Sequence, residues 1–168
     1  MIVTVGDATS VSHVYFGDTG ADNTGQITYN HTSEYMNFVT NTAERVRIDG
    51  SGNVGIGNTA PAAKLQVTDD SLLLDGTTGA IPATGAGTRL MWYPAKAAFR
   101  AGVVAGTQWD DANIGTNSTV GGGLSNQAAG ADATISGGTT NTASGAQSTV
   151  SGGTTNVVTC PPGLCPVL

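Results

Sequence analysis

The chain has 168 residues, of which 25 are glycine, 12 are acidic and only 6 are basic. Glycine is about twice as frequent as its ~7% average, and charged residues are about half as frequent as usual, yet ordinary apolar content excludes a disordered chain. A net charge of −6 and the absence of an apolar run near ~20 residues lead us to expect neither nucleic acid nor membrane as a partner.

The first strongly patterned segment is residues 44–67. Its opening stretch, residues 45–49, alternates charged and apolar side chains, which predicts a half-buried strand with a charged outer face. A turn at residues 50–53 leads to a second predicted strand, residues 54–57, whose alternate positions are glycines. Because a glycine face lets another backbone approach closely, we expect such an approach there. A third strand begins at Lys64.

This motif, E-R-x-R-I-D-x-x-G-N-V-G-I-G-x-x-x-P-x-x-K-L-x-V, resembles the shaft module of bacteriophage tail fibres and related appendages. Residues 14–18, 25–31 and 35–39 are similar to the strands that precede the motif in those proteins. The resemblance implies an all-β, elongated, homotrimeric fibre in which strands of three chains interdigitate. It places residues 1–75 in a shaft segment, and the protein in a virion tail appendage or on an extracellular surface.

Residues 76–112 are interpreted as an aromatic β connector. Residues 88–93 are predicted to form a strand. Residues 94–100 form either a single helical turn that starts at the proline or a turn between two strands. We favour the turn between strands, because the segment is short and its surroundings are all β.

Four aromatic residues are concentrated in this connector: Trp92, Tyr93, Phe99 and Trp109. We expect them to form a local plug by ordinary core packing beneath the repeat that follows. The alternative is functional, with Trp92, Tyr93 and Trp109 contacting a receptor or a glycan.

A 15-residue repeat occupies residues 113–156. Thr-Val-Gly-Gly-Gly at position 119 recurs as Thr-Ile-Ser-Gly-Gly at 134 and Thr-Val-Ser-Gly-Gly at 149, and an asparagine follows each copy in the same phase. A short fixed period with one β-branched apolar residue per unit predicts a β-solenoid whose stacked units share a core. Glycine then permits the corners, and asparagine stacks or caps a turn through its side chain. The alternative is a flexible linker, but linkers do not usually keep such residues in phase.

The unit T-V-S-G-G-x-x-N-x-A-S-G resembles the head repeats of YadA-like trimeric adhesins. That resemblance implies a left-handed β-roll within a trimer. Together, the two resemblances predict interdigitated strands followed by β-roll or triple-stranded β-helix repeats of 15 residues.

Residues 157–168 are interpreted as a carboxy-terminal staple rich in cysteine and proline. Cys160 and Cys165 are expected to form disulfides, either within one chain or between chains, with free thiols as the alternative. Disulfides persist outside a reducing cytosol, which agrees with an extracellular particle.

No catalytic, cofactor or metal site is predicted. The neighbouring acids Asp69–Asp70 and Asp110–Asp111 point to opposite faces if they lie in strands, so neither pair converges as a glycosidase requires. His13 and His31 are isolated, and no nucleophile elbow or phosphate loop is present.

We therefore expect a non-enzymatic structural fibre protein of a virion appendage that forms or presents a host-attachment fibre. The expected partners are two further copies of the chain, other virion or fibre subunits, and a glycan or protein of a host surface. The alternative is a trimeric surface adhesin or a self-assembling extracellular filament. A glycan-degrading tailspike is a third, less favoured interpretation.

Overall fold

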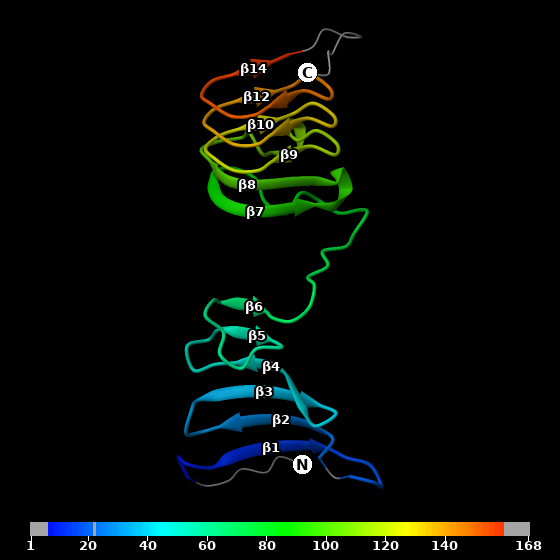
Figure 1. Cartoon of the computed structure of the whole chain (residues 1–168), viewed down its shortest axis with the longest axis vertical. Coiled ribbons are helices and arrows are strands. Elements are labelled where there is room, and N and C mark those ends of the chain that lie inside the picture. The colour runs from blue at the N-terminus through cyan, green and yellow to red at the C-terminus, as the bar shows by residue number, and fades with distance from the viewer. Residues whose placement is uncertain (1–6, 22, 160–168) are drawn as a thin grey trace. The chain divides into compact units, whose positions relative to one another are not determined.

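The computed structural model describes residues 7–21 and 23–159 of the chain, which divides into two compact units, Met1–Leu73 and Leu74–Leu168 (Figure 1). The described residues are almost entirely strands and turns, so the all-β prediction is confirmed. None of their few helical turns is long and apolar enough to cross a membrane.

The first unit is a single six-stranded sheet in chain order. Neighbouring strands are antiparallel from the first to the fifth, and the last pair is parallel. The strands are β1 (Val11–Phe16), β2 (Gly25–Asn30), β3 (Tyr35–Thr40), β4 (Ala43–Ile48), β5 (Val54–Ile56) and β6 (Leu65–Val67). The three strands predicted within residues 44–67 are thus confirmed.

The glycine of β5 is required by a close backbone approach. A Cβ atom at Gly55 would lie only 2.1 Å from the carbonyl oxygen of Asn58, so the loop after the strand folds back directly over it. The predicted close approach is confirmed, and the approaching backbone belongs to the chain's own loop.

The second unit begins with a hairpin of β7 (Gly87–Tyr93) and β8 (Ala98–Val104). The strands are joined by a 3-10 turn, Pro94–Lys96, after which Ala97 adopts a left-handed conformation with φ of 47°. The preferred prediction of a turn between two strands is confirmed, and the helical turn that starts at the proline is that connection. A second 3-10 turn, Asp111–Asn113, precedes the repeat.

The repeat forms a β-solenoid in which one chain closes each 15-residue coil. One side is a parallel continuation of β8, with sheet order β13-β11-β9-β8-β7, and the second is the sheet β10-β12-β14. The third side is a line of single bridges through Val103, Leu124, Thr139 and Thr154. The strands are β9 (Thr119–Val120), β10 (Gln127–Ala128), β11 (Thr134–Ile135), β12 (Thr142–Ala143), β13 (Thr149–Val150) and β14 (Val157–Val158).

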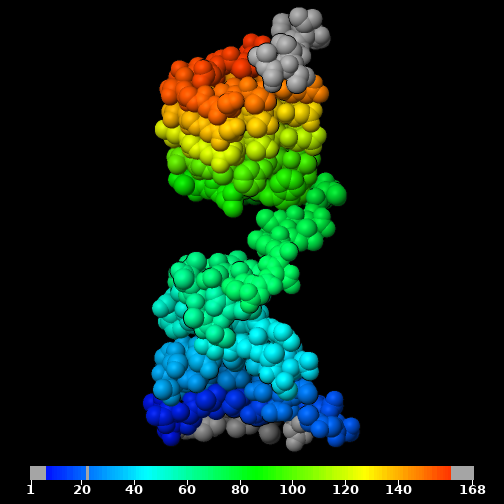
Figure 2. Space-filling model, in the orientation of Figure 1, coloured from blue at the N-terminus to red at the C-terminus, as the bar shows by residue number. Residues whose placement is uncertain are grey.

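The coils stack through small inward side chains and form a continuous body in the space-filling view (Figure 2). Val120, Ile135 and Val150 make one inward column, and Ala128 and Ala143 make another; all are buried. One coil alone buries too little to offset its ordering entropy of about 1–2 kcal/mol per residue, so each coil depends on its neighbours.

A ladder of asparagine side chains runs through the solenoid. The Oδ1 atom of Asn126 accepts hydrogen bonds from the backbone N of Asn141 at 2.9 Å and from its Nδ2 at 3.1 Å. The Oδ1 atom of Asn141 accepts the same pair from Asn156, at 2.9 and 3.0 Å. The Nδ2 atom of Asn141 also donates to the carbonyls of Gly137 and Gly153. The predicted role of these residues is confirmed, because they both stack on one another and bond the carbonyls of the turns.

Positive φ at the corners explains part of the glycine content of the repeat. Gly123 and Gly138 have φ of 87° and 94°, and a Cβ atom on either would lie 2.0 or 2.1 Å from a carbonyl oxygen of the next coil. A side chain at these corners would therefore separate the coils.

We predict that Asn141→Ala lowers the free energy of unfolding by about 2–4 kcal/mol, because it removes all the hydrogen bonds of a fully buried carboxamide to Asn126, Gly137, Gly153 and Asn156 and leaves a cavity. Asn156→Ala is the matched control, since Asn156 holds the same place in the last described coil but is exposed, and its loss should cost less than about 1 kcal/mol. Denaturant unfolding followed by circular dichroism measures both. Equal losses would show that the ladder does not stabilise the stack.

Candidate assembly interface

The sheet of the first unit separates its side chains by polarity. Cross-strand partners share a face, and the register aligns two rows of apolar side chains on the same side. We call this side the apolar face. It comprises Val14, Ile27, Phe38, Val46, Ile56 and Val67 in one row and Tyr29, Met36, Ile48, Val54 and Leu65 in the other.

No second layer covers the apolar face in the described part of the chain. Phe38 is 39% exposed, Ile56 42% and Leu65 60%. All of the buried hydrophobic side chains among residues 7–21 and 23–159 belong to the second unit, between Met91 and Val150. A contiguous exposed apolar surface of this kind is typical of an interaction site.

The opposite face carries polar side chains that hydrogen-bond to one another, although the buried Oδ1 atom of Asn37 has no partner among the described residues. Glu44 accepts hydrogen bonds from Arg47 at 2.6 and 2.8 Å and from Asn37 at 2.5 Å, and the Arg47 guanidinium lies 3.8 Å from the centre of the Tyr35 ring. Burial opposes ionisation of Glu44, but these hydrogen bonds outweigh it and hold its pKa below the ordinary value. The side chains of the polar face therefore find partners within the chain, whereas those of the apolar face are not covered by any described residues.

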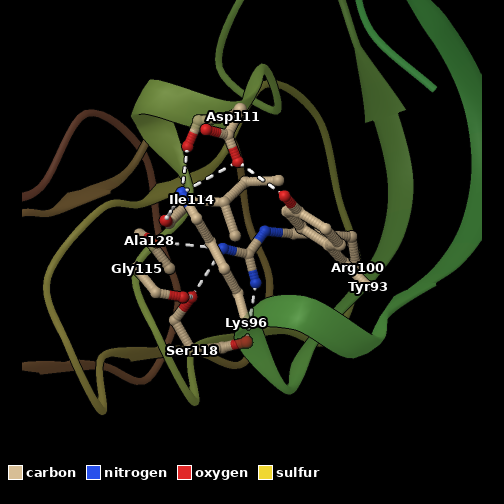
Figure 3. Close-up of polar contacts among 8 residues, drawn as sticks. All are labelled: Tyr93, Lys96, Arg100, Asp111, Ile114, Gly115, Ser118 and Ala128. Carbon is tan, nitrogen blue, oxygen red and sulfur yellow. Dashed lines mark hydrogen bonds and ion pairs between the residues drawn. The ribbon is translucent and has the colours of Figure 1, made fainter. Parts of the chain in front are cut away.

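Arg100 is a buried cation at the first turn of the solenoid, and the sequence analysis did not anticipate it. It pairs with Val120 across β8 and β9, so its side chain enters the inward column. Figure 3 shows the guanidinium pointing toward Ser118 and Ala128. Its Nη1 donates to the carbonyls of Phe99 and Ser118 at 2.8 and 2.7 Å, and its Nη2 donates to Ser118 Oγ and the Ala128 carbonyl at 2.7 and 2.9 Å.

No described carboxylate forms an ion pair with Arg100. Burial alone therefore acts on the guanidinium and lowers the pKa of Arg100 to about 10. All of its hydrogen bonds go to groups of the same chain. We therefore interpret Arg100 as the residue that fills the first end of the solenoid core, next to Val120.

Asp111 ties the two 3-10 turns together. It accepts a hydrogen bond from the Tyr93 hydroxyl at 2.8 Å and forms an ion pair with Lys96 at 3.0 Å, while Lys96 also donates to the Ile114 carbonyl (Figure 3). The bonds from Lys96 and Tyr93 hold the pKa of Asp111 below its ordinary value, and the same contact raises the pKa of Tyr93. Its neighbour Asp110 instead accepts from the backbone of Gly85, so the two carboxylates have separate partners.

The aromatic connector is divided between the inside and the outside. Trp109 is 0% exposed and its Nε1 donates to the Asn126 carbonyl at 2.8 Å, and Tyr93 is 6% exposed. Both belong to the predicted plug, and their burial leaves neither accessible to a receptor in this unit. Phe99, also predicted in the plug, is instead 36% exposed on the outer side of β8, because its strand neighbours Ala98 and Arg100 take the inward positions. Trp92 is half-buried on the outer side of β7.

The predicted staple cysteines, Cys160 and Cys165, lie outside the described residues. Within residues 7–21 and 23–159, no three His, Cys, Asp or Glu side chains are grouped so that they could hold a metal ion. No family model matches the chain, and no curated protein matches it.

Arg100→Ala should destabilise the second unit by about 3–5 kcal/mol, because it leaves a cavity at the first end of the solenoid core. Arg100→Met should cost less than about 2 kcal/mol, since it restores volume without a buried charge. The Ser118 and Ala128 carbonyls keep backbone N–H partners in both variants. If both variants lose the same free energy of unfolding in denaturant titrations, the hydrogen bonds of the guanidinium, rather than its volume, stabilise this end of the solenoid core.

A pH dependence follows from Asp111. Because its pKa in the fold lies below the ordinary value of 3.8, ionised Asp111 stabilises the fold above that pH, and the contribution is lost as the pH falls through the lower folded value. Asp111→Asn should therefore melt below wild type at pH 7, and the difference should shrink as the pH falls below 3.8. Thermal melts across that range measure it. A difference independent of pH would mean that the charge of Asp111 contributes nothing.

Proposed function

We propose that this chain is a structural subunit of an extracellular fibre, a virion appendage of the tail-fibre kind, and that it assembles as a homotrimer through the apolar face. The observation that carries the proposal is the single-layer sheet of the first unit, whose eleven apolar side chains have no covering layer in the described chain.

A further copy of the chain is the occupant that this surface suits best. The two rows that define the apolar face contain no charged side chain, and Glu34, bonded to Tyr29, and Arg45, bonded to Thr40, lie at their margins. The rows of two identical faces can therefore meet without like charges between them, and each supplies the apolar surface that the other lacks. A closed cyclic arrangement covers every face and leaves none to propagate. The choice of three chains rests on the resemblance of residues 44–67 to trimeric fibre shafts.

The second candidate is a trimeric surface adhesin or a filament that grows end to end. The repeat resemblance favours it, together with one observation on the solenoid. Among the described residues, β13 and β14 are paired on one side only and present free parallel edges. Free edges of this kind are templates for additional strands.

The assembly is tested by absolute mass from light scattering. We expect about three times the 16.7 kDa mass of one chain. Phe38→Glu, which places a charge on the apolar face, should reduce the mass to that of one chain. Gln26→Glu adds the same charge on the polar face and is the matched control, which should keep the assembled mass.

A wild-type chain that stays monomeric at high concentration, with its first unit folded, would refute the proposal. Long polydisperse threads in negative-stain images would favour the filament over the trimer.

A further inference from the structure

One outer side of the solenoid carries a row of aromatic and hydroxyl side chains that the structural account leaves without a role. Strands β7, β8, β9, β11 and β13 lie side by side in one sheet. Their register brings five outward residues into a single cross-strand row: Trp92, Phe99, Thr119, Thr134 and Thr149. We call this row, with its outward neighbours Leu90, Ser136 and Ser151, the platform.

The outward direction of the platform follows from burial along each strand. Trp92 lies between the buried residues Met91 and Tyr93, and Thr134 precedes the fully buried Ile135. Leu90, at 72% exposed, is among the most exposed apolar residues of the chain. Two aromatic rings and a large aliphatic side chain thus lie together on the outer surface of this sheet, beside a row of threonines.

The platform has unused hydrogen-bonding capacity. The indole N–H of Trp92 has no acceptor among the described residues but is itself buried, so the capacity open to a ligand lies in the hydroxyl groups. The hydroxyls of Thr119, Thr134 and Thr149 make no hydrogen bond to any described residue, and neither do those of Ser136 and Ser151. Adjacent strands in a sheet are about 4.8 Å apart, so these hydroxyls form a ladder with a regular spacing.

We propose that the platform binds a neutral glycan chain. The C–H bonds on one face of a pyranose ring form an apolar patch that packs on an aromatic side chain such as Trp92 or Phe99. The hydroxyl groups around the ring edge then find partners in the Thr and Ser ladder. No charged side chain points outward in these rows, so the surface suits an uncharged polymer rather than an acidic one.

Polarity distinguishes this surface from the apolar face of the first unit. There, nearly every position in the rows is apolar, as an interface between copies requires, whereas three of the five residues in the platform row are threonines. Ligand sites typically combine apolar stacking surface with a few polar groups that fix orientation, and the platform has that composition. The inference goes beyond the proposed structural role in a fibre, because it assigns a contact surface and a ligand class.

Binding is tested with the full-length protein on a printed array of neutral and acidic host-type glycans, followed by titration of the best neutral glycan. Titration with the intrinsic tryptophan signal should show a change that saturates. Trp92→Ala and Phe99→Ala should each weaken binding about tenfold or more, as expected for loss of an aromatic anchor. Leu124→Ala, which removes an exposed apolar side chain from a different side of the solenoid, is the matched control and should bind as wild type.

Light scattering on the same samples separates the two proposals. An assembled protein that binds no neutral glycan, or one whose binding survives Trp92→Ala, overturns the platform and leaves the fibre proposal standing. A monomer that binds through Trp92 supports the platform and refutes the assembly. A Trp92→Ala variant that dissociates while wild type binds no glycan overturns the platform and identifies a copy–copy interface instead.

Discussion

A sheet can bury apolar side chains only where a second layer covers it, and both units of this chain are organised by that requirement. The solenoid supplies its own second layer, because each coil places one sheet opposite the other. The column that contains Ile135 and the column that contains Ala143 are therefore buried in one interior. The first unit is a single sheet with no such return. Its apolar face is therefore exposed in the described chain, and the assembly of copies that we propose would cover it.

The interior of the solenoid is narrow, and this constrains its chemistry. Small residues fill it, glycines let backbones approach at the corners, and the asparagine ladder satisfies backbone groups that a thin core leaves unpaired. At the first turn the chain is a hairpin rather than a coil, and the core ends on large groups, Trp109 and Arg100. The outward aromatic residues have no part in this closure, which is why we assign them to recognition.

The repeat could be predicted because its signal is local. Val or Ile, glycine and asparagine recur every 15 residues, and this period indicates both the shape of one coil and the stacking of the next coil on it. Arg100 could not, because it lies 20 residues before Val120, outside the 15-residue phase that would place it in the inward column. Strand alternation separates Trp92 from Tyr93, but which of the two points inward depends on how the hairpin joins the first coil. The apolar face depends on the register of six strands, which composition does not specify.

Hydrogen exchange measured across a dilution series tests the central claim most directly, because it reports on each sheet separately. The account predicts that amides of β2 to β4 are protected when the protein is concentrated and lose protection as the assembly dissociates, while amides of β9 to β13 stay protected throughout. Equal and undiminished protection of β2 to β4 in a monomeric chain would contradict it, since the single sheet would then be stable without a covering partner.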